Sequence, residues 1–188
     1  MIARLRIQKL SLNHLHVNVA PTSSLPPSLP SPVPLITQQD LETHINALRG
    51  NGWYFRQSNR NIEQNDMWEL RHSGRFPSFK AAMGYVNDVA NLAKSEKHHP
   101  TIVIFDRVNV AIALITHDTA KPPIIDAPST DLHAPATRHP GITLRDIRMA
   151  LLINPLLDLY KVIDRSPPTE DPIPRYEDLM GVNIEKSN

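Results

Sequence analysis

Apolar residues recur every three or four positions between 38 and 49, which is the spacing of one helix face. Thr37 precedes this stretch, and Asp40 lies three positions after Thr37. A Thr and an acidic residue at that separation are typical of a helix start, because their side chains accept from the first free backbone N–H groups. Gly50 then supplies a stop signal. The pattern predicts a first helix over 38–49.

A second helical pattern begins after Pro77 and Ser78 and ends before Pro100. Proline is favoured at helix starts and disfavoured inside helices, so the two prolines bracket the element. The apolar residues form one stripe over about four turns. They are Phe79, Met83, Val86, Ala90 and Ala93.

A third helix is predicted after Thr143, with Asp146 in its first turn. Leu144, Ile147 and Leu151 follow on one side of it. The pair Asn154-Pro155 should break or kink this helix, since the residue before a proline avoids helical backbone.

Strand signals fill the spaces between the helices. Residues 53–55 begin a short strand, and 67–72 alternate between two sets of side chains with a period of two. The β-rich runs 101–105 and 108–117 are separated only by the polar pair at 106–107, which predicts an antiparallel hairpin.

These elements follow one another as α-β-β-α-β-β-α. Paired strands with interleaved helices favour an α+β fold, here a four-stranded antiparallel sheet with three helices packed on one face. We expect this domain to span 36–164, with 118–140 as a long loop insertion and 165–188 as a flexible C-terminal tail. The Pro-rich run at 21–34 is expected to be a linker that packs no core.

The segment before Asp40 contains no acidic residue, while Arg4, Arg6 and Lys9 alternate with apolar side chains. A basic, acid-free and amphipathic start is typical of a mitochondrial transit segment. Residues 1–35 are therefore predicted to be either such a segment or a disordered extension. The protein would be mitochondrial in the first case and cytoplasmic in the second.

Composition narrows the function classes. The chain has 20 basic and 19 acidic residues, a net charge of +1, and no cluster of Lys or Arg, so no nucleic-acid partner is expected. It has no cysteine, which excludes disulfides, thiolate catalysis and cysteine–zinc sites and fits a reducing compartment. No apolar run approaches the length of a transmembrane helix, so no membrane span is expected.

Three histidines are the candidate chemical groups. His98 and His99 lie where the second helix gives way to a strand, and His117 closes the second strand of the predicted hairpin. A hairpin brings the end of its second strand back beside the start of its first, so we expect the three imidazoles to meet. Imidazole exchanges protons near neutral pH, which predicts metal-free acid–base chemistry on a small ligand.

Other roles for these histidines are less favoured. Zinc would need converging rings, but adjacent histidines entering a strand point to opposite sides, and no His-Glu-x-x-His pair is present. They could instead cap the helix end. No Ser or Thr lies in a nucleophile motif. His72 ends a predicted strand and could line the same pocket, but a surface position is favoured.

Beyond this pattern, three runs resemble the pterin-4a-carbinolamine dehydratase family. They are FPSFKAAMGYVNDVANLAKSEKHHPTI, a strand ending in THD, and GITLRDIRMA. The resemblance covers roughly 37–154. It implies the dehydration of 4a-hydroxytetrahydropterin to quinonoid dihydropterin without metal or cofactor, as part of tetrahydrobiopterin recycling. It also implies a homodimer or homotetramer.

The resemblance further implies roles for four residues. His98 and His117 would exchange protons with the departing 4a-hydroxyl and a ring nitrogen. His99 would bind and orient the pterin, and Asp146 would be a supporting, substrate-binding residue near the pocket.

Some positions depart from the family pattern. Lys94 and Lys97 stand where members usually carry acidic or amide residues, and 118–140 separate the last histidine from the third helix. The alternative function is therefore a catalytically degenerate pterin-binding module. A further alternative is a protein-dimerisation module, since animal members also act as transcriptional coactivators.

Overall fold

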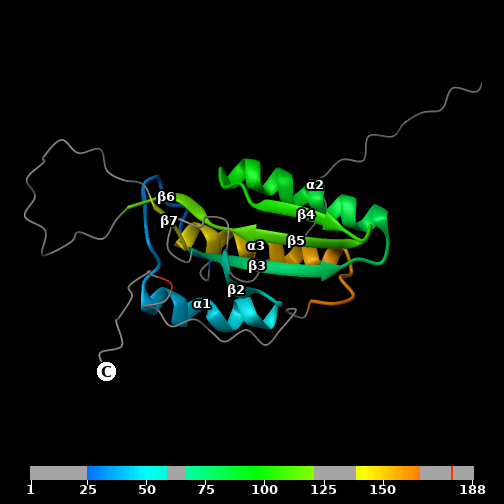
Figure 1. Cartoon of the computed structure of the whole chain (residues 1–188), viewed down its shortest axis with the longest axis horizontal. Helices are drawn as coiled ribbons and strands as arrows, with labels where there is room; N and C mark the ends of the chain where they lie inside the picture. The colour runs from blue at the N-terminus through cyan, green and yellow to red at the C-terminus, as the bar shows by residue number, and fades with distance from the viewer. Residues whose placement is uncertain (1–24, 59–66, 121–138, 166–178, 180–188) are drawn as a thin grey trace, which may run out of the picture.

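The computed structural model describes residues 25–58, 67–120, 139–165 and Leu179 (Figure 1). In chain order the elements are β1 (Val33–Pro34), α1 (Gln38–Gly50), β2 (Tyr54–Ser58), β3 (Met67–Arg75), α2 (Phe79–Glu96), β4 (Thr101–Phe105), β5 (Asn109–Leu114), β6 (Thr116–Ala120), β7 (His139–Gly141) and α3 (Leu144–Leu159). Residues 1–24 of the predicted transit segment or disordered extension lie outside the described residues.

Four of the strands form the main sheet, in the order β2-β3-β5-β4 with every neighbouring pair antiparallel. The turn between β4 and β5 contains Asp106 and Arg107, both at positive φ (45° and 67°), which suits the twist of a hairpin. The α+β class and the four-stranded antiparallel sheet are confirmed. The element order differs from the predicted one by three additional short strands, β1, β6 and β7.

Local capping fixes the start of each helix. Thr37, Ser78 and Thr143 are the N-caps of α1, α2 and α3, and each side chain accepts a hydrogen bond from a backbone N–H of the first turn. All three starts agree with the sequence prediction. A break or kink is predicted at Pro155, and the helix does not break there, because α3 continues through it to Leu159.

The hydrophobic core contains side chains from all three helices and from one face of the main sheet. In Figure 1, α3 lies behind the strands, between α1 and α2, and it packs against both. The side of α2 that enters the core is formed by Ala82, Tyr85, Val89 and Ala93. Of the predicted stripe, Ala93 is buried here and Val86 packs, partly buried, against the core, whereas Phe79 is 58% exposed. Helix α2 therefore has apolar residues on a second, outward side.

A second, three-stranded sheet has the order β1-β6-β7. β6 pairs in parallel with β1 and antiparallel with β7, with an irregular register between Thr116 and Thr119. The predicted strand over 108–117 is thus two strands, β5 and β6, that belong to different sheets. Both ends of the predicted loop at 118–140 also lie in this sheet. Residues 121–138 are outside the described part of the chain.

Residues 25–35 correct the prediction of a linker that packs no core. Val33 is fully buried and forms β1, and Leu35 bridges to Thr143. The proline-rich composition excludes a helix but allows this extended path across the sheet edge. Of the C-terminal tail, only Leu179 is described, and it is buried in the core.

His72 also differs from expectation, since it is only 1% exposed. Its ring centroid lies 5.2 Å from that of Trp53. Burial, with a smaller contribution from the positive charge of Arg165, lowers the pKa of His72 to about 4. None of the helices in the described ranges is long and apolar enough to cross a bilayer.

Candidate active site

Asp146 is the third residue of α3 and completes a capping box with Thr143. Its Oδ2 accepts hydrogen bonds from the Thr143 backbone N–H at 2.8 Å and from the Thr143 hydroxyl at 3.1 Å. A capping box places a carboxylate where helix N–H groups and the helix dipole both favour negative charge. The local sequence thus fixes the position of this carboxylate.

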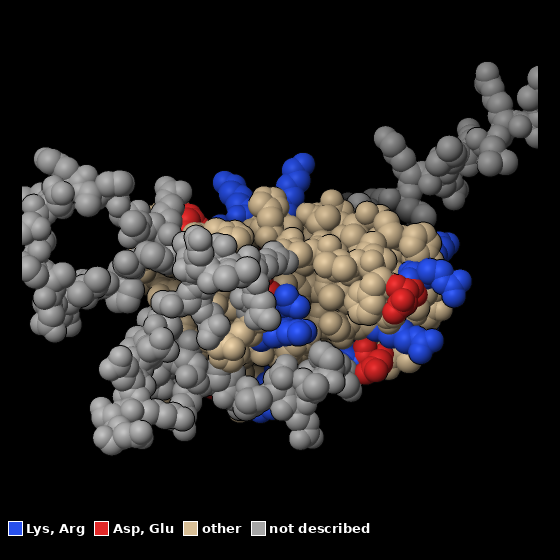
Figure 2. Space-filling view, viewed as in Figure 1, with Lys and Arg blue, Asp and Glu red and all other residues tan. Residues whose placement is uncertain are grey.

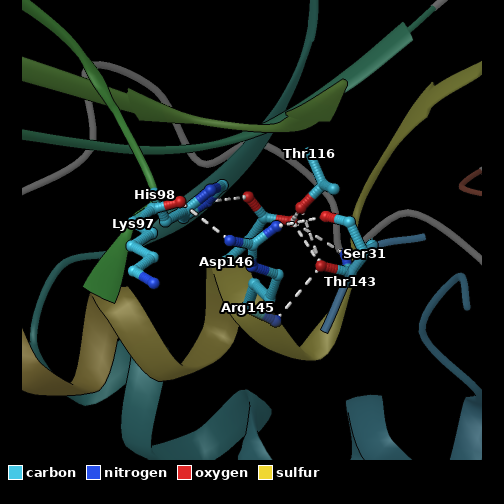
Figure 3. A network of polar contacts seen from close by, with 7 residues as sticks. All are labelled: Ser31, Lys97, His98, Thr116, Thr143, Arg145 and Asp146. Carbon is cyan, nitrogen blue, oxygen red and sulfur yellow. Dashed lines mark hydrogen bonds and ion pairs between the residues drawn. The ribbon is translucent and has the colours of Figure 1, made fainter. Parts of the chain in front are cut away.

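Two distant segments bring further donors to the same carboxylate (Figure 3). Oδ1 accepts from His98 Nε2 at 2.8 Å, and Oδ2 accepts from the Thr116 hydroxyl at 2.9 Å. The Thr116 and Thr143 hydroxyls also lie 2.8 Å apart. All four side chains are buried, and His98, at 6%, is the most exposed of them. We call these four residues the Asp146 network.

The Asp146 network selects one tautomer of His98. An ionised carboxylate accepts hydrogen bonds and cannot donate them, so Nε2 of His98 is the donor. The other ring nitrogen, Nδ1, is then the one able to accept or release a proton. A charge-assisted bond between buried groups also holds the ring orientation.

The backbone that carries His98 is held from two directions. Lys97 ends α2 in the left-handed conformation (φ 52°), and the His98 N–H donates to Ala93 O at 3.1 Å. Arg145 Nη2 donates to Lys97 O at 2.8 Å, and its Nη1 donates to Ser31 Oγ at 3.1 Å. Arg145 therefore joins three segments around His98 (Figure 3).

His99 and His117 differ from His98 in being exposed. His117 directly follows Thr116 in β6, and side chains alternate along a strand, so Thr116 faces Asp146 while His117 points away from it. Within the described residues, neither imidazole takes part in the hydrogen bonds of the Asp146 network. The structure brings His98 and Asp146 together, and a single cavity shared by all three histidines stays a prediction.

A cavity of about 620 Å³ lies beside the network. Its lining includes the residues next to His98, His117 and Asp146 in the chain, namely Lys97, Asp118 and Arg145. This volume is in the range of ligand pockets in proteins. As for metals, no group of three or more His, Cys, Asp or Glu side chains among the described residues could hold an ion.

Sequence reasoning identified His98 and Asp146 separately but missed Thr116 and Arg145. Thr116 stands directly before His117 in the run THD, and Arg145 stands directly before Asp146 in the run GITLRDIRMA. Each precedes a residue that was singled out, so the two dipeptides were the available signal. Thr116 and Arg145 bind residues that lie far away in the chain, and these contacts depend on how the elements pack.

Comparisons with known proteins identify the family of this chain. The sequence model of the family described as "Pterin 4 alpha carbinolamine dehydratase" matches residues 34–126. A protein of Roseiflexus castenholzii (strain DSM 13941 / HLO8), named "Putative pterin-4-alpha-carbinolamine dehydratase", is 34% identical over 84 residues, which are 45% of this chain and 76% of the relative. The chain belongs to the pterin-4a-carbinolamine dehydratase family.

The matched range of the family includes the three histidines but ends before Asp146. The carboxylate that binds His98 thus comes from a part of the chain that follows the undescribed residues 121–138. Among solved structures, a transcriptional coactivator/pterin dehydratase from Brucella melitensis is similar with a TM-score of 0.41 and 22% identity. That likeness covers 65% of this chain and 97% of the other.

Proposed function

We propose that this member of the pterin-4a-carbinolamine dehydratase family catalyses the dehydration of 4a-hydroxytetrahydropterin. The hydroxyl at C4a receives a proton, the C4a–O bond breaks and water leaves. A proton is removed from a ring nitrogen, which gives quinonoid dihydropterin. Gain and loss of one proton balance, so the reaction consumes no oxidant, reductant or cofactor.

His98 and His117 are the proposed proton-exchanging groups, and His99 binds and orients the pterin. His98 would exchange its proton at Nδ1, because Nε2 is bound to Asp146. The exposed imidazoles of His99 and His117 are accessible to a ligand from solvent. A positioned imidazole contributes about a hundred- to ten-thousand-fold to such a step.

The observation that carries this proposal is the buried 2.8 Å contact between His98 and Asp146. A histidine that only capped a helix would not need a buried carboxylate to fix its tautomer. Burial of both groups makes the arrangement rigid and keeps water from competing for the bond.

Formation of quinonoid dihydropterin, followed by its absorbance, tests the proposal. We expect His98→Gln, His99→Gln and His117→Gln each to lower the rate by at least about tenfold. His44→Gln is the matched control, because His44 lies on α1, outside the Asp146 network. If all four variants turn over at the wild-type rate, the histidines are not catalytic, and a binding module becomes the better description.

We also propose that the protein self-associates through β4. This strand is at the edge of the main sheet, and its apolar side chains Val103, Ile104 and Phe105 are 49%, 39% and 43% exposed. Figure 2 shows a broad area without charged side chains over β4 and β5. Exposed apolar edge strands pair readily with another chain, which supports a homodimer or homotetramer.

A further inference from the structure

The N-terminal strap, residues 25–35, lies across the end of the domain that carries the Asp146 network. All but its last two residues precede the range that matches the family, which begins at residue 34. The strap is therefore an addition to the matched domain. Its role has to be derived from its contacts in this chain.

Backbone pairing and burial fix the C-terminal half of the strap. β1 pairs in parallel with β6 through Val33 and Thr119, and the Val33 side chain is fully buried. β6 is the strand that also contains Thr116 and His117. The strap is thus a structural neighbour of two residues of the proposed reaction.

Two arginines of α3 fix its N-terminal half. Arg148 Nη1 donates to Pro26 O at 2.8 Å, and Arg145 Nη1 donates to Ser31 Oγ at 3.1 Å. Pro26 is buried although proline-rich segments are usually exposed. The guanidinium groups provide the planar, multiple donors that can bind two acceptors at once.

The same two arginines also bind the end of α2. Arg148 contacts both carboxylate oxygens of Glu96, at 2.8 and 3.1 Å, and Arg145 donates to Lys97 O at 2.8 Å. Glu96 and Lys97 immediately precede His98. Each arginine therefore links the strap to the turn that positions this histidine.

A cavity of about 620 Å³ opens between these elements. The strap supplies residues 28–31, and the rest of the domain supplies Glu96, Lys97, Asp118 and Arg145. The Ser28 hydroxyl and the Lys97 ammonium can donate to a polar ligand group, and the oxygen atoms of the lining serines and carboxylates have lone pairs that can accept from it. The carbon atoms of Leu29 and Pro30 add an apolar part to the lining.

We infer that the N-terminal strap is a fixed wall of the substrate site and that the cavity behind it binds the polar substituent of the pterin ring. This inference rests on the proposed function for the identity of the ring. The strap would then determine which pterins bind, while the histidines act on the ring itself. A strap that only stabilised the fold would affect all pterins equally.

The test compares two dihydropterins that do not react, one with a dihydroxypropyl side chain and one with a methyl group at the same position. Their dissociation constants are measured by calorimetry on the full chain. Ser28→Trp fills the cavity from an exposed position of the strap, and Gln39→Trp, at an exposed position of α1, is the matched control. Ser28→Glu is a second, smaller variant.

We expect Ser28→Trp to weaken binding of the dihydroxypropyl pterin by at least about tenfold, which is about 1.4 kcal/mol. Binding of the methyl pterin should change less than about twofold, and Gln39→Trp should leave both unchanged. Ser28→Glu should change the preference between the two pterins in the same direction. Equal effects on the two ligands, or none on either, would overturn the inference.

Because the readout is binding, failure of the inference differs from failure of the proposed function. A wild-type protein that binds both pterins but forms no quinonoid product would disprove the dehydratase proposal. The inference about the strap would then be decided by pterin binding to the two Ser28 variants. If the wild-type protein forms product and Ser28→Trp binds both pterins as the wild type does, only the inference about the strap is disproved. A protein that binds neither pterin would overturn both.

Discussion

The imidazole of His98 and the carboxylate of Asp146 are in contact at 2.8 Å, although 48 positions separate them in the chain. His98 follows the C-terminal end of α2, and Asp146 lies in the first turn of α3. Packing of α2 against α3 therefore creates the contact. The predicted catalytic histidine thus depends on how two helices meet, and its chemistry can be tested through the carboxylate.

Asp146→Asn should lower kcat by at least about tenfold, since the amide no longer fixes the tautomer and the ring orientation of His98. Asp40→Asn is the matched control, because Asp40 holds the same capping-box position on α1 and its carboxylate accepts hydrogen bonds from Thr37. Equal losses in kcat for both variants would mean that Asp146 acts only as a helix cap.

His72 should make the protein sensitive to mild acid. Burial lowers its folded pKa to about 4, while the unfolded chain has the ordinary value of 6.5. Its neutral form is favoured in the fold, so its contribution is complete above pH 6.5. As pH falls from 6.5 to about 4, the unfolded state takes up a proton that the folded state does not, and about 3 kcal/mol of stability is lost.

Urea unfolding at pH 7.5 and at pH 4.5 measures this loss. His72→Gln should reduce the difference in unfolding free energy between the two pH values by about 2 to 3 kcal/mol, whatever its stability at pH 7.5. His44→Gln provides a comparison at a less buried position. A wild-type pH dependence that survives in His72→Gln would show that other groups cause it.

Gly52→Ala should destabilise the fold by about 2 kcal/mol or more. Gly52 has φ +83°, and an added Cβ would lie 2.0 Å from the backbone oxygen of Arg165. Gly50→Ala is the control, because its Cβ would meet nothing within 4 Å. Gly50→Ala should be neutral or stabilising by up to about 1 kcal/mol, since it reduces backbone freedom at the end of α1. Thermal unfolding of both variants decides this, and similar melting temperatures would contradict the described path of residues near Arg165.

Val103→Lys should shift the protein to a smaller assembly. A charge on the edge strand β4 opposes pairing with another chain, while Val103 is exposed enough to tolerate it in the monomer. Light scattering after size exclusion gives the mass. Ile163→Lys, at a more exposed apolar residue outside the sheet, should keep the wild-type mass. A wild-type mass for Val103→Lys would place self-association on another surface.

Several elements could be predicted because they depend on residues close in the chain. The capping boxes of α1 and α3 each join residues three apart, so Thr37 and Thr143 marked the helix starts correctly. The hairpin at Asp106 and Arg107 was equally local. The buried side of α2, in contrast, could not be predicted from residues close in the chain. This helix has apolar residues on two sides, and only contact with the rest of the domain decides which side is buried.

The sequence by itself determined the helix caps, the hairpin of β4 and β5 and the family, because short-range hydrogen bonds and apolar periodicity act within each segment. Only the tertiary structure decided that Asp146 binds His98, that Thr116 rather than His117 faces this carboxylate, and that the proline-rich strap is held by Arg145. Such contacts join segments up to 114 positions apart. Their geometry depends on how the helices and both sheets pack together, which no single segment of the chain encodes.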